Sequence, residues 1–221
     1  NKGVKLYEIG KIYLPVEGQK LPDEPKRMIF GTYGEHENFF TLKGEIDAIL
    51  DQLNVHPATY IADTKNPSYH PGRCADVAVE GQVIGTLGEI HPLVAKNYDV
   101  SGRMYVARLN FTALLALQNT EIAYKPLPKY PSVARDIAVV CDAATPVGDL
   151  EACISRSGKG LVKEVELFDI YTGSPIPEGK KSVAFSLKLR SDDHTLTDQE
   201  ADEDVKAILA ALEAQLGAVL R

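Results

Sequence analysis

The sequence predicts an α+β protein of two domains, and two observations support this class. The second half reads as strands and two capped helices in the order β-α-β-β-α-β, and a proline-rich stretch separates it from a strand-rich first half. Hydrophobic residues make up 44% and charged residues 25% of the chain, which is the balance of a globular protein. Its 221 residues suffice for one large domain or two modest ones.

The first half, residues 1–120, predicts a mixed domain with a mainly antiparallel sheet. An amphipathic helix is expected over 39–53, because its apolar residues recur three or four positions apart. A hairpin across Glu80-Gly81-Gln82 joins two strands. The remaining elements are a short helix at 111–117 and strands at 6–14, 27–32, 73–79, 83–90 and 104–109.

A linker is predicted at residues 121–132. Pro126, Pro128 and Pro131 stand within a few residues of one another, and closely spaced prolines prevent a helix or a central strand. The alternative is a long surface loop. We favour a linker between domains 1–120 and 133–221, because the apolar patterning changes across it.

The second domain begins with a strand at 133–141. Thr145 then suits the N-cap of a helix, with Pro146 at its first position, and the helix runs to about Arg156. Strands follow at 161–171 and 181–190. In the latter, Val183, Phe185, Leu187 and Leu189 share one side, while Ala184, Ser186, Lys188 and Arg190 share the other.

A capping box, Thr197-Asp-Gln-Glu200, starts the last helix, and Gly217 ends it before a short strand at 218–221. The order β-α-β-β-α-β is the split βαβ, or ferredoxin-like, arrangement. Two helices should cover one face of four strands. The opposite face is left to water, a partner or RNA.

Composition limits the class of protein further. Cys74, Cys141 and Cys153 are three cysteines without close spacing, which favours a reducing cytosol over a disulfide framework, so we expect a cytoplasmic protein. No apolar run approaches the roughly 20 residues that span a bilayer. The sequence opens inside a strand and without Met, which suggests a piece of a longer protein.

RNA binding would need a local surface, because the net charge is −7. From residue 126 onward, 11 Lys and Arg face 16 Asp and Glu, and seven of these acids lie between 192 and 204. Without that cluster the count is 11 against 9, so we expect the sheet side to accept phosphate. Candidate RNA contacts are Arg135, Lys188, Arg190 and, by stacking, Phe168; Tyr171 is a second aromatic candidate. The alternative is solvated strand charges.

Residue chemistry favours no catalytic or metal site. His70, Cys74 and His91 lack the fourth ligand and the close pairs typical of zinc, and no triad partner is visible. Gly81, Gly85 and Gly88 space like a glycine-rich turn, yet no Lys-Ser/Thr pair and no helix follows them. Tight turns and close strand packing are the simpler interpretation. His70, Arg73 and His91 are expected to be structural or subunit contacts.

Eight distinctive strings follow one another along essentially the whole chain. They are Leu6-Tyr-Glu-Ile-Gly10, Phe39-Phe-Thr-Leu-Lys-Gly44, Tyr69-His-Pro-Gly-Arg-Cys-Ala75, Ile84-Gly-Thr-Leu-Gly-Glu-Ile-His-Pro92, Tyr130-Pro-Ser-Val-Ala-Arg-Asp-Ile137, Glu166-Leu-Phe-Asp-Ile-Tyr171, Gly179-Lys-Lys-Ser-Val-Ala-Phe-Ser-Leu187 and Thr195-Leu-Thr-Asp198. Taken in this order, the strings resemble the C-terminal part of the β subunit of bacterial phenylalanyl-tRNA synthetase. The first half resembles the domain shaped like a class II synthetase catalytic core, and the second half resembles the ferredoxin-fold anticodon-binding domain.

The resemblance implies a subunit of a phenylalanine-tRNA ligase that supports a catalytic α subunit and contacts the anticodon region of tRNA(Phe). Full-length proteins of this family form two-α, two-β assemblies, and the whole enzyme uses ATP and Mg²⁺. This piece alone is expected to be non-catalytic and to hold no cofactor, because the last Arg-bearing motif of class II synthetases has no counterpart.

Two other functions remain open. Domains of β-α-β-β-α-β order also bind free amino acids as regulatory modules, although Asp142-Ala-Ala-Thr-Pro146 replaces the glycine-rich loop that such sites favour. The exposed sheet could instead be covered by protein in a pure assembly domain. Binding to an anticodon stem-loop separates both from the RNA-binding hypothesis.

Overall fold

The computed structural model describes residues 2–121, 123–124 and 126–221. The chain falls into two compact units, Asn1–Ala123 and Tyr124–Arg221. Between them, the predicted linker follows helix α3 (Phe111–Leu117) and precedes strand β7 (Val133–Asp142). Positions 122 and 125 of that linker lie outside the described residues.

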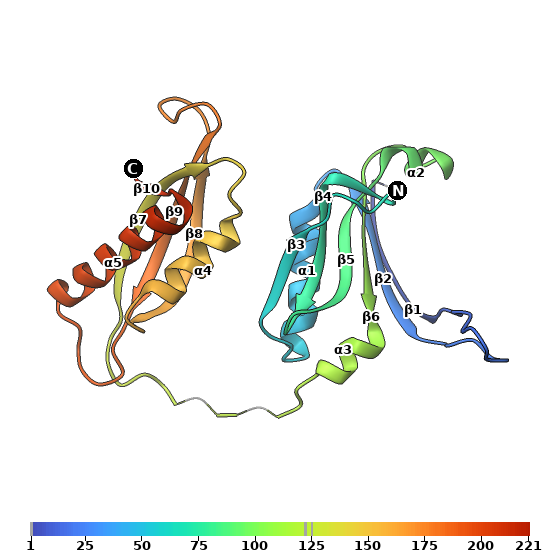
Figure 1. Cartoon of the computed structure of the whole chain (residues 1–221), viewed down its shortest axis with the longest axis horizontal. Coiled ribbons are helices and arrows are strands. Elements are labelled where there is room, and N and C mark those ends of the chain that lie inside the picture. Colours follow the sequence, from blue (N-terminus) through green and yellow to red (C-terminus); the bar gives the residue numbers. More distant parts are fainter. Residues whose placement is uncertain (1, 122, 125) are drawn as a thin grey trace. The chain divides into compact units, whose positions relative to one another are not determined.

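The first unit is built on a six-stranded sheet in the order β1-β2-β6-β5-β4-β3 (Figure 1). Every neighbouring pair is antiparallel, which confirms the predicted sheet type. The strands are β1 (Gly3–Lys11), β2 (Lys26–Gly34), β3 (Ala58–Ala62), β4 (Tyr69–Val79), β5 (Gln82–Ile90) and β6 (Met104–Asn110).

Helix α1 (Phe39–Gln52) forms the core of this unit with the sheet. Leu42, Ile46 and Leu50 recur every four residues, so they share one side of the helix and are almost fully buried. They pack in one cluster with Leu87 and Leu109 of the sheet and with Leu114 of α3. Asn38 caps the helix by accepting from the N–H groups of Phe40 and Thr41.

The structure differs from the sequence prediction at three elements of this unit. Strand β3 and helix α2 (Pro92–Asn97) were not predicted; with five and six residues they are too short to show a clear period. The first strand covers 3–11 and not 6–14. Beyond it, Leu14 makes only an isolated bridge to Asp23.

The second unit contains a four-stranded antiparallel sheet in the order β10-β7-β9-β8. Its other strands are β8 (Val162–Tyr171), β9 (Lys180–Leu189) and β10 (Val219–Leu220). The first and third strands along the chain, β7 and β9, pair over their whole length at the centre. This is the predicted ferredoxin-like arrangement.

Helices α4 (Val147–Ser157) and α5 (Asp198–Leu216) cover one face of that sheet (Figure 1). Leu150 and Ile154 of α4 and Ile208 and Leu212 of α5 are fully buried. They form one cluster with strand side chains of a single parity: Ile137, Val139, Cys141, Val183, Phe185 and Leu187. In the described part of the chain, the opposite face carries no helix.

The ends of the two helices agree with the sequence in one case and not in the other. The Thr197–Glu200 capping box is present, and Gly217 ends α5 in the left-handed conformation with φ 59°. The predicted Thr145 cap of α4 is wrong. Pro146 holds the N-cap without a side-chain bond, while the Thr145 N–H bonds the Asp142 carbonyl in a turn at 3.0 Å.

Candidate functional site

Lys188 lies on the open face of the second unit, where strand parity places it. Its neighbour Leu187 is fully buried under the helices, whereas the Lys188 side chain is half exposed. Lys188 Nζ lies 2.7 Å from Glu164 Oε2 on the neighbouring strand. This hydrogen bond and the charge of Glu164 raise the pKa of Lys188, so the lysine stays charged but is already paired.

Arg135 lies on the opposite side, because it stands in register with the buried Leu187. Its Nη2 is 2.7 Å from Asp198 Oδ1 and its Nε 3.0 Å from Asp202 Oδ1, both at the start of α5. These bonds raise the pKa of the guanidinium, with Asp198 the larger cause. The expected grouping of Arg135 with Lys188 is corrected: Arg135 ties β7 to the last helix.

Arg190 lies just beyond the end of β9, which stops at Leu189. Its side chain is 25% exposed and its Nε is 3.9 Å from Asp192 Oδ1. Asp192 pairs more closely with Lys163, at 2.9 Å. Among the described residues, Arg190 Nε is buried without a hydrogen-bond partner. Arg190 is thus held near an acid at the strand end, so like Lys188 it lies beside a carboxylate.

Two exposed aromatic side chains lie on the edge strand β8. Its pairing shifts from Leu167↔Phe185 to Asp169↔Ala184, so Phe168 is the extra residue of a bulge and is 56% exposed. Tyr171 stands opposite Ser182 on the open face, and its hydroxyl donates to the Ser174 carbonyl at 2.7 Å. The predicted stacking candidates are therefore accessible.

Arg221 is a residue of this face that sequence reasoning missed. Its guanidinium lies 5.9 Å from the centre of the Tyr171 ring, and its N–H bonds the Ala138 carbonyl at 2.9 Å. A cation over an aromatic ring is attracted by the ring's negative face. No local motif predicts this contact, because it depends on the last strand pairing with β7.

The open face carries more carboxylates than the sequence count implied. Asp136 and Glu166 both stand opposite Ser186, and Glu164 stands opposite Lys188, so all three share the side of Lys188. The expectation that acids gather at the start of α5 and leave the sheet side basic is corrected. This face offers aromatic rings and paired cations, which suits nucleobases better than a run of phosphates.

In the first unit, His70 and His91 hold the backbone. His70 Nδ1 accepts from the Gly72 N–H at 3.0 Å, and His91 Nδ1 accepts from the Leu93 N–H at 3.2 Å, which caps α2. Cys74 is buried, and burial raises the pKa of its thiol to about 11, so it is a poor nucleophile at neutral pH. Within the described residues, no cluster of three or more His, Cys, Asp or Glu is arranged to hold a metal.

The glycines of β5 serve strand packing. A Cβ on Gly85 would come within 2.6 Å of the Arg108 carbonyl oxygen, and one on Gly88 within 2.5 Å of the Arg73 carbonyl oxygen. Close approach of strands is thus the use of both residues, as predicted. Beside them, Arg73 Nη1 donates to the buried Glu89 carboxylate at 2.9 Å.

Comparison with known proteins gives this geometry its context. Residues 1–111 match the family described as the phenylalanyl tRNA synthetase beta chain CLM domain, and residues 128–221 match the ferredoxin-fold anticodon binding domain. The chain belongs to the phenylalanyl-tRNA synthetase β-chain family. The α+β class predicted from the sequence agrees with this membership.

Family relatives are the phenylalanine–tRNA ligase beta subunits of several bacteria. The chain is 41% identical to that of Clostridium tetani, covering 100% of this chain and 28% of the relative. The values are 40%, 100% and 29% for Geobacillus kaustophilus, and 39%, 99% and 28% for Bacillus subtilis. The chain thus spans less than a third of the length of these relatives.

Among solved structures, the chain is similar to a pyrrolysyl-tRNA synthetase of Desulfitobacterium hafniense. The TM-score is 0.43 and the identity 13%, over 52% of this chain and 40% of that one. Separately, among the described residues of this family member, no helix is both long and apolar enough to cross a bilayer.

Proposed function

We propose that the chain acts within a phenylalanine–tRNA ligase, where the open face of the second unit contacts the anticodon region of tRNA(Phe). The observation that carries this proposal is the exposed pair Phe168 and Tyr171 on a sheet face without helices, in a domain of the anticodon-binding family. Single-stranded RNA loops are recognised largely by bases stacked on such rings.

Charge supports stacking as the main contact. Lys188 is neutralised by Glu164, and Asp136 and Glu166 lie on the same face, so few cations remain for phosphates. Arg221 is the cation placed over Tyr171, where it can lie beside a stacked base. We therefore expect the affinity for the RNA to fall more when an aromatic side chain is removed than when the salt concentration is raised. Other parts of the enzyme would add their own RNA contacts.

For the first unit, we propose support of a catalytic α subunit in an α2β2 assembly. The whole ligase would use ATP and Mg²⁺ in joining phenylalanine to its tRNA, with the working site on the α subunit. Packing contacts of Gly85 and Gly88 support a role without nucleotide. Strand β1 exposes Tyr7 and Ile9 on one face and Leu6 on the other, which offers apolar side chains to a partner. His70, Arg73 and His91 would maintain this unit's shape.

Binding of a fluorescent anticodon stem-loop of tRNA(Phe) tests the RNA contact. Tyr171→Ala should weaken binding by about 1–3 kcal/mol, the usual value for one stacked base. Tyr98→Ala, which removes a 77% exposed tyrosine of the first unit, is the matched control and should bind as the parent does.

Two results would contradict the proposal. Equal binding by both variants would remove the stacking role of the open face and favour an assembly domain. Stabilisation of the chain by a free amino acid in a thermal-shift assay, without RNA binding, would favour the regulatory alternative.

A further inference from the structure

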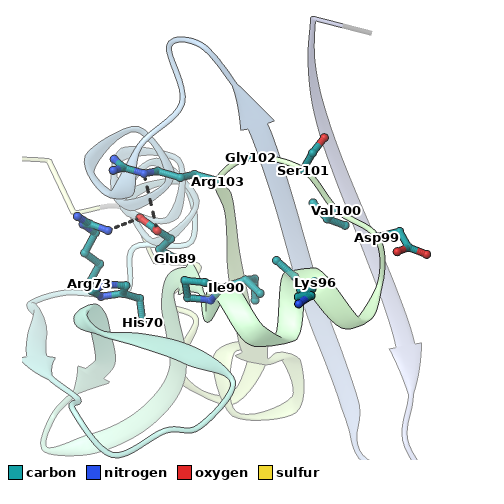
Figure 2. Close-up of a pocket in the computed structure, with 12 residues that line it drawn as sticks. His70, Arg73, Glu89, Ile90, Lys96, Asp99, Val100, Ser101, Gly102 and Arg103 are labelled. Carbon is teal, nitrogen blue, oxygen red and sulfur yellow. Dashed lines mark hydrogen bonds and ion pairs between the residues drawn. The ribbon is translucent and has the colours of Figure 1, made fainter.

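A cavity of about 570 Å³ lies in the first unit. It is lined from β4, from β5, and from α2 and the loop that leads into β6 (Figure 2). Arg73, Glu89 and Arg103 stand on one side of it, and we name this cavity the Arg–Glu–Arg pocket after them. Its volume is within the range of small-molecule sites, roughly 300–1,000 Å³.

The fold brings these three side chains together through a bulge and a glycine. Pairing of β4 with β5 breaks between Tyr69 and Cys74, so Arg73 lies at the edge of the ladder. Gly88 lets the backbone at Arg73 approach closely and places Arg73 beside Glu89. Arg103 is the residue immediately before β6, and β6 pairs with β5, the strand that carries Glu89.

Glu89 lies between the two guanidinium groups (Figure 2). Its side chain is 5% exposed, with Arg73 Nη1 at 2.9 Å from Oε2 and Arg103 Nε at 3.9 Å from Oε1. One carboxylate can neutralise only one of two arginines. The distance to Arg103 exceeds a hydrogen bond, and within the described residues Arg103 donates none elsewhere.

The surplus of positive charge is local. Lys96 adds a third cation to the lining and Asp99 a second acid, so cations exceed carboxylates by one in a chain whose net charge is −7. The Arg103 side chain is 65% exposed, so its donors remain accessible from solvent. The lining also includes four apolar residues, Ile90, Pro92, Ala95 and Val100.

We propose that the Arg–Glu–Arg pocket binds a small organic anion with an apolar body. Its carboxylate or phosphate group would accept hydrogen bonds from Arg103, and Arg73 would supply the second positive charge. A planar guanidinium matches either anion through two parallel hydrogen bonds. The apolar body would lie against Ile90 and Val100, and Glu89 holds Arg73 through the hydrogen bond of 2.9 Å.

Benzoate and phenyl phosphate are suitable probes, with neutral benzamide as the control ligand. Binding to the whole chain is followed by amide NMR shifts and by titration calorimetry. Both anions should bind and should shift the amides of Ser101, Gly102 and Arg103, and benzamide should not. The tighter of the two anions shows whether the site is built for a carboxylate or for a phosphate.

Two variants that change the charge of the pocket in opposite directions make the test specific. Arg103→Gln should weaken anion binding at least tenfold. Arg27→Gln is the matched control, because Arg27 donates to Asn110 on the same sheet, outside the pocket. Glu89→Gln, if folded by circular dichroism, should bind anions more tightly, since it removes the competing carboxylate.

The proposal is overturned if neither anion binds at millimolar concentration or if benzamide binds equally well. It is also overturned if the Arg103 and Arg27 variants lose affinity alike. None of these measurements uses RNA, so their failure leaves the proposed anticodon contact untouched.

Discussion

Gly88 shows how a single missing side chain shapes the first unit. A Cβ there would meet the Arg73 carbonyl oxygen at 2.5 Å and Cys74 Cα at 2.9 Å, and both are backbone atoms that cannot turn away. Gly88→Ala should therefore lower the free energy of unfolding by about 1–3 kcal/mol, the usual cost of overpacking. Urea denaturation measures the change.

Gly31→Ala is the control for that experiment. Gly31 lies on β2 of the same sheet, and an added Cβ would meet nothing within 4 Å. Its stability should stay close to that of the parent. If both variants unfold at the same urea concentration, strand approach is not the reason for glycine at position 88.

Glu200 links a helix cap to pH. Its carboxylate accepts from the Thr197 backbone N–H first, then from the Thr197 hydroxyl and His194, and these bonds lower its pKa from 4.5 to about 2. Because the folded-state pKa is depressed, the stabilisation is complete above about pH 4.5. It is lost as the pH falls towards 2.

Glu200→Gln should therefore reduce stability at pH 6 and have a smaller effect at pH 3, measured by urea unfolding at both values. Glu213→Gln, at an exposed position of the same helix, is the control. A stability difference between parent and Glu200→Gln that is the same at both pH values would contradict the role of the ionised carboxylate.

At the scale of elements, β9 tests the claim that helices cover one side of the second sheet. Phe185 is fully buried in the cluster that includes α4 and α5, whereas the next residue, Ser186, points to the open face. Phe185→Ala should cost about 3–5 kcal/mol and Ser186→Ala less than about 0.5 kcal/mol. Similar losses from the two substitutions would contradict the assignment of faces.

Elements with a strong period or cap were predictable from sequence. The alternation from Val183 to Leu189 placed the buried and open sides of β9 correctly, and the Thr197–Glu200 box located the start of α5. Strand β3 and helix α2 escaped prediction because a segment of five or six residues has too few positions to show a period. Thr145 looked like a cap, but Pro146 holds that position.

The candidate site was predictable only in part. Parity identified the side of Lys188, and residue type identified Phe168 and Tyr171. Pairing across strands decides the rest: Arg135 reaches Asp198 and Asp202 over 63 and 67 residues of sequence. Carboxylates of β7 and β8, among them Asp136, Glu164, Glu166 and Asp169, share the face of Lys188 for the same reason, since register is set by the whole sheet.

At the scale of the whole molecule, we propose a different function for each of the two units. The first uses close strand packing and an apolar edge to support a partner, and the second presents a helix-free sheet to RNA. Such a surface gains affinity from the rest of an assembly, so we expect the isolated chain to bind RNA weakly. The net charge of the chain is −7, which does not favour non-specific binding to nucleic acid.

Cysteine footprinting of the bound anticodon stem-loop tests the central claim most directly. Glu166→Cys places a thiol on the open face and Ala210→Cys one on the exposed side of α5, while the natural Cys74, Cys141 and Cys153 are buried. The RNA should slow alkylation at position 166 and leave position 210 unchanged. Protection at 210 with none at 166 would place the RNA on the helical side and contradict the account.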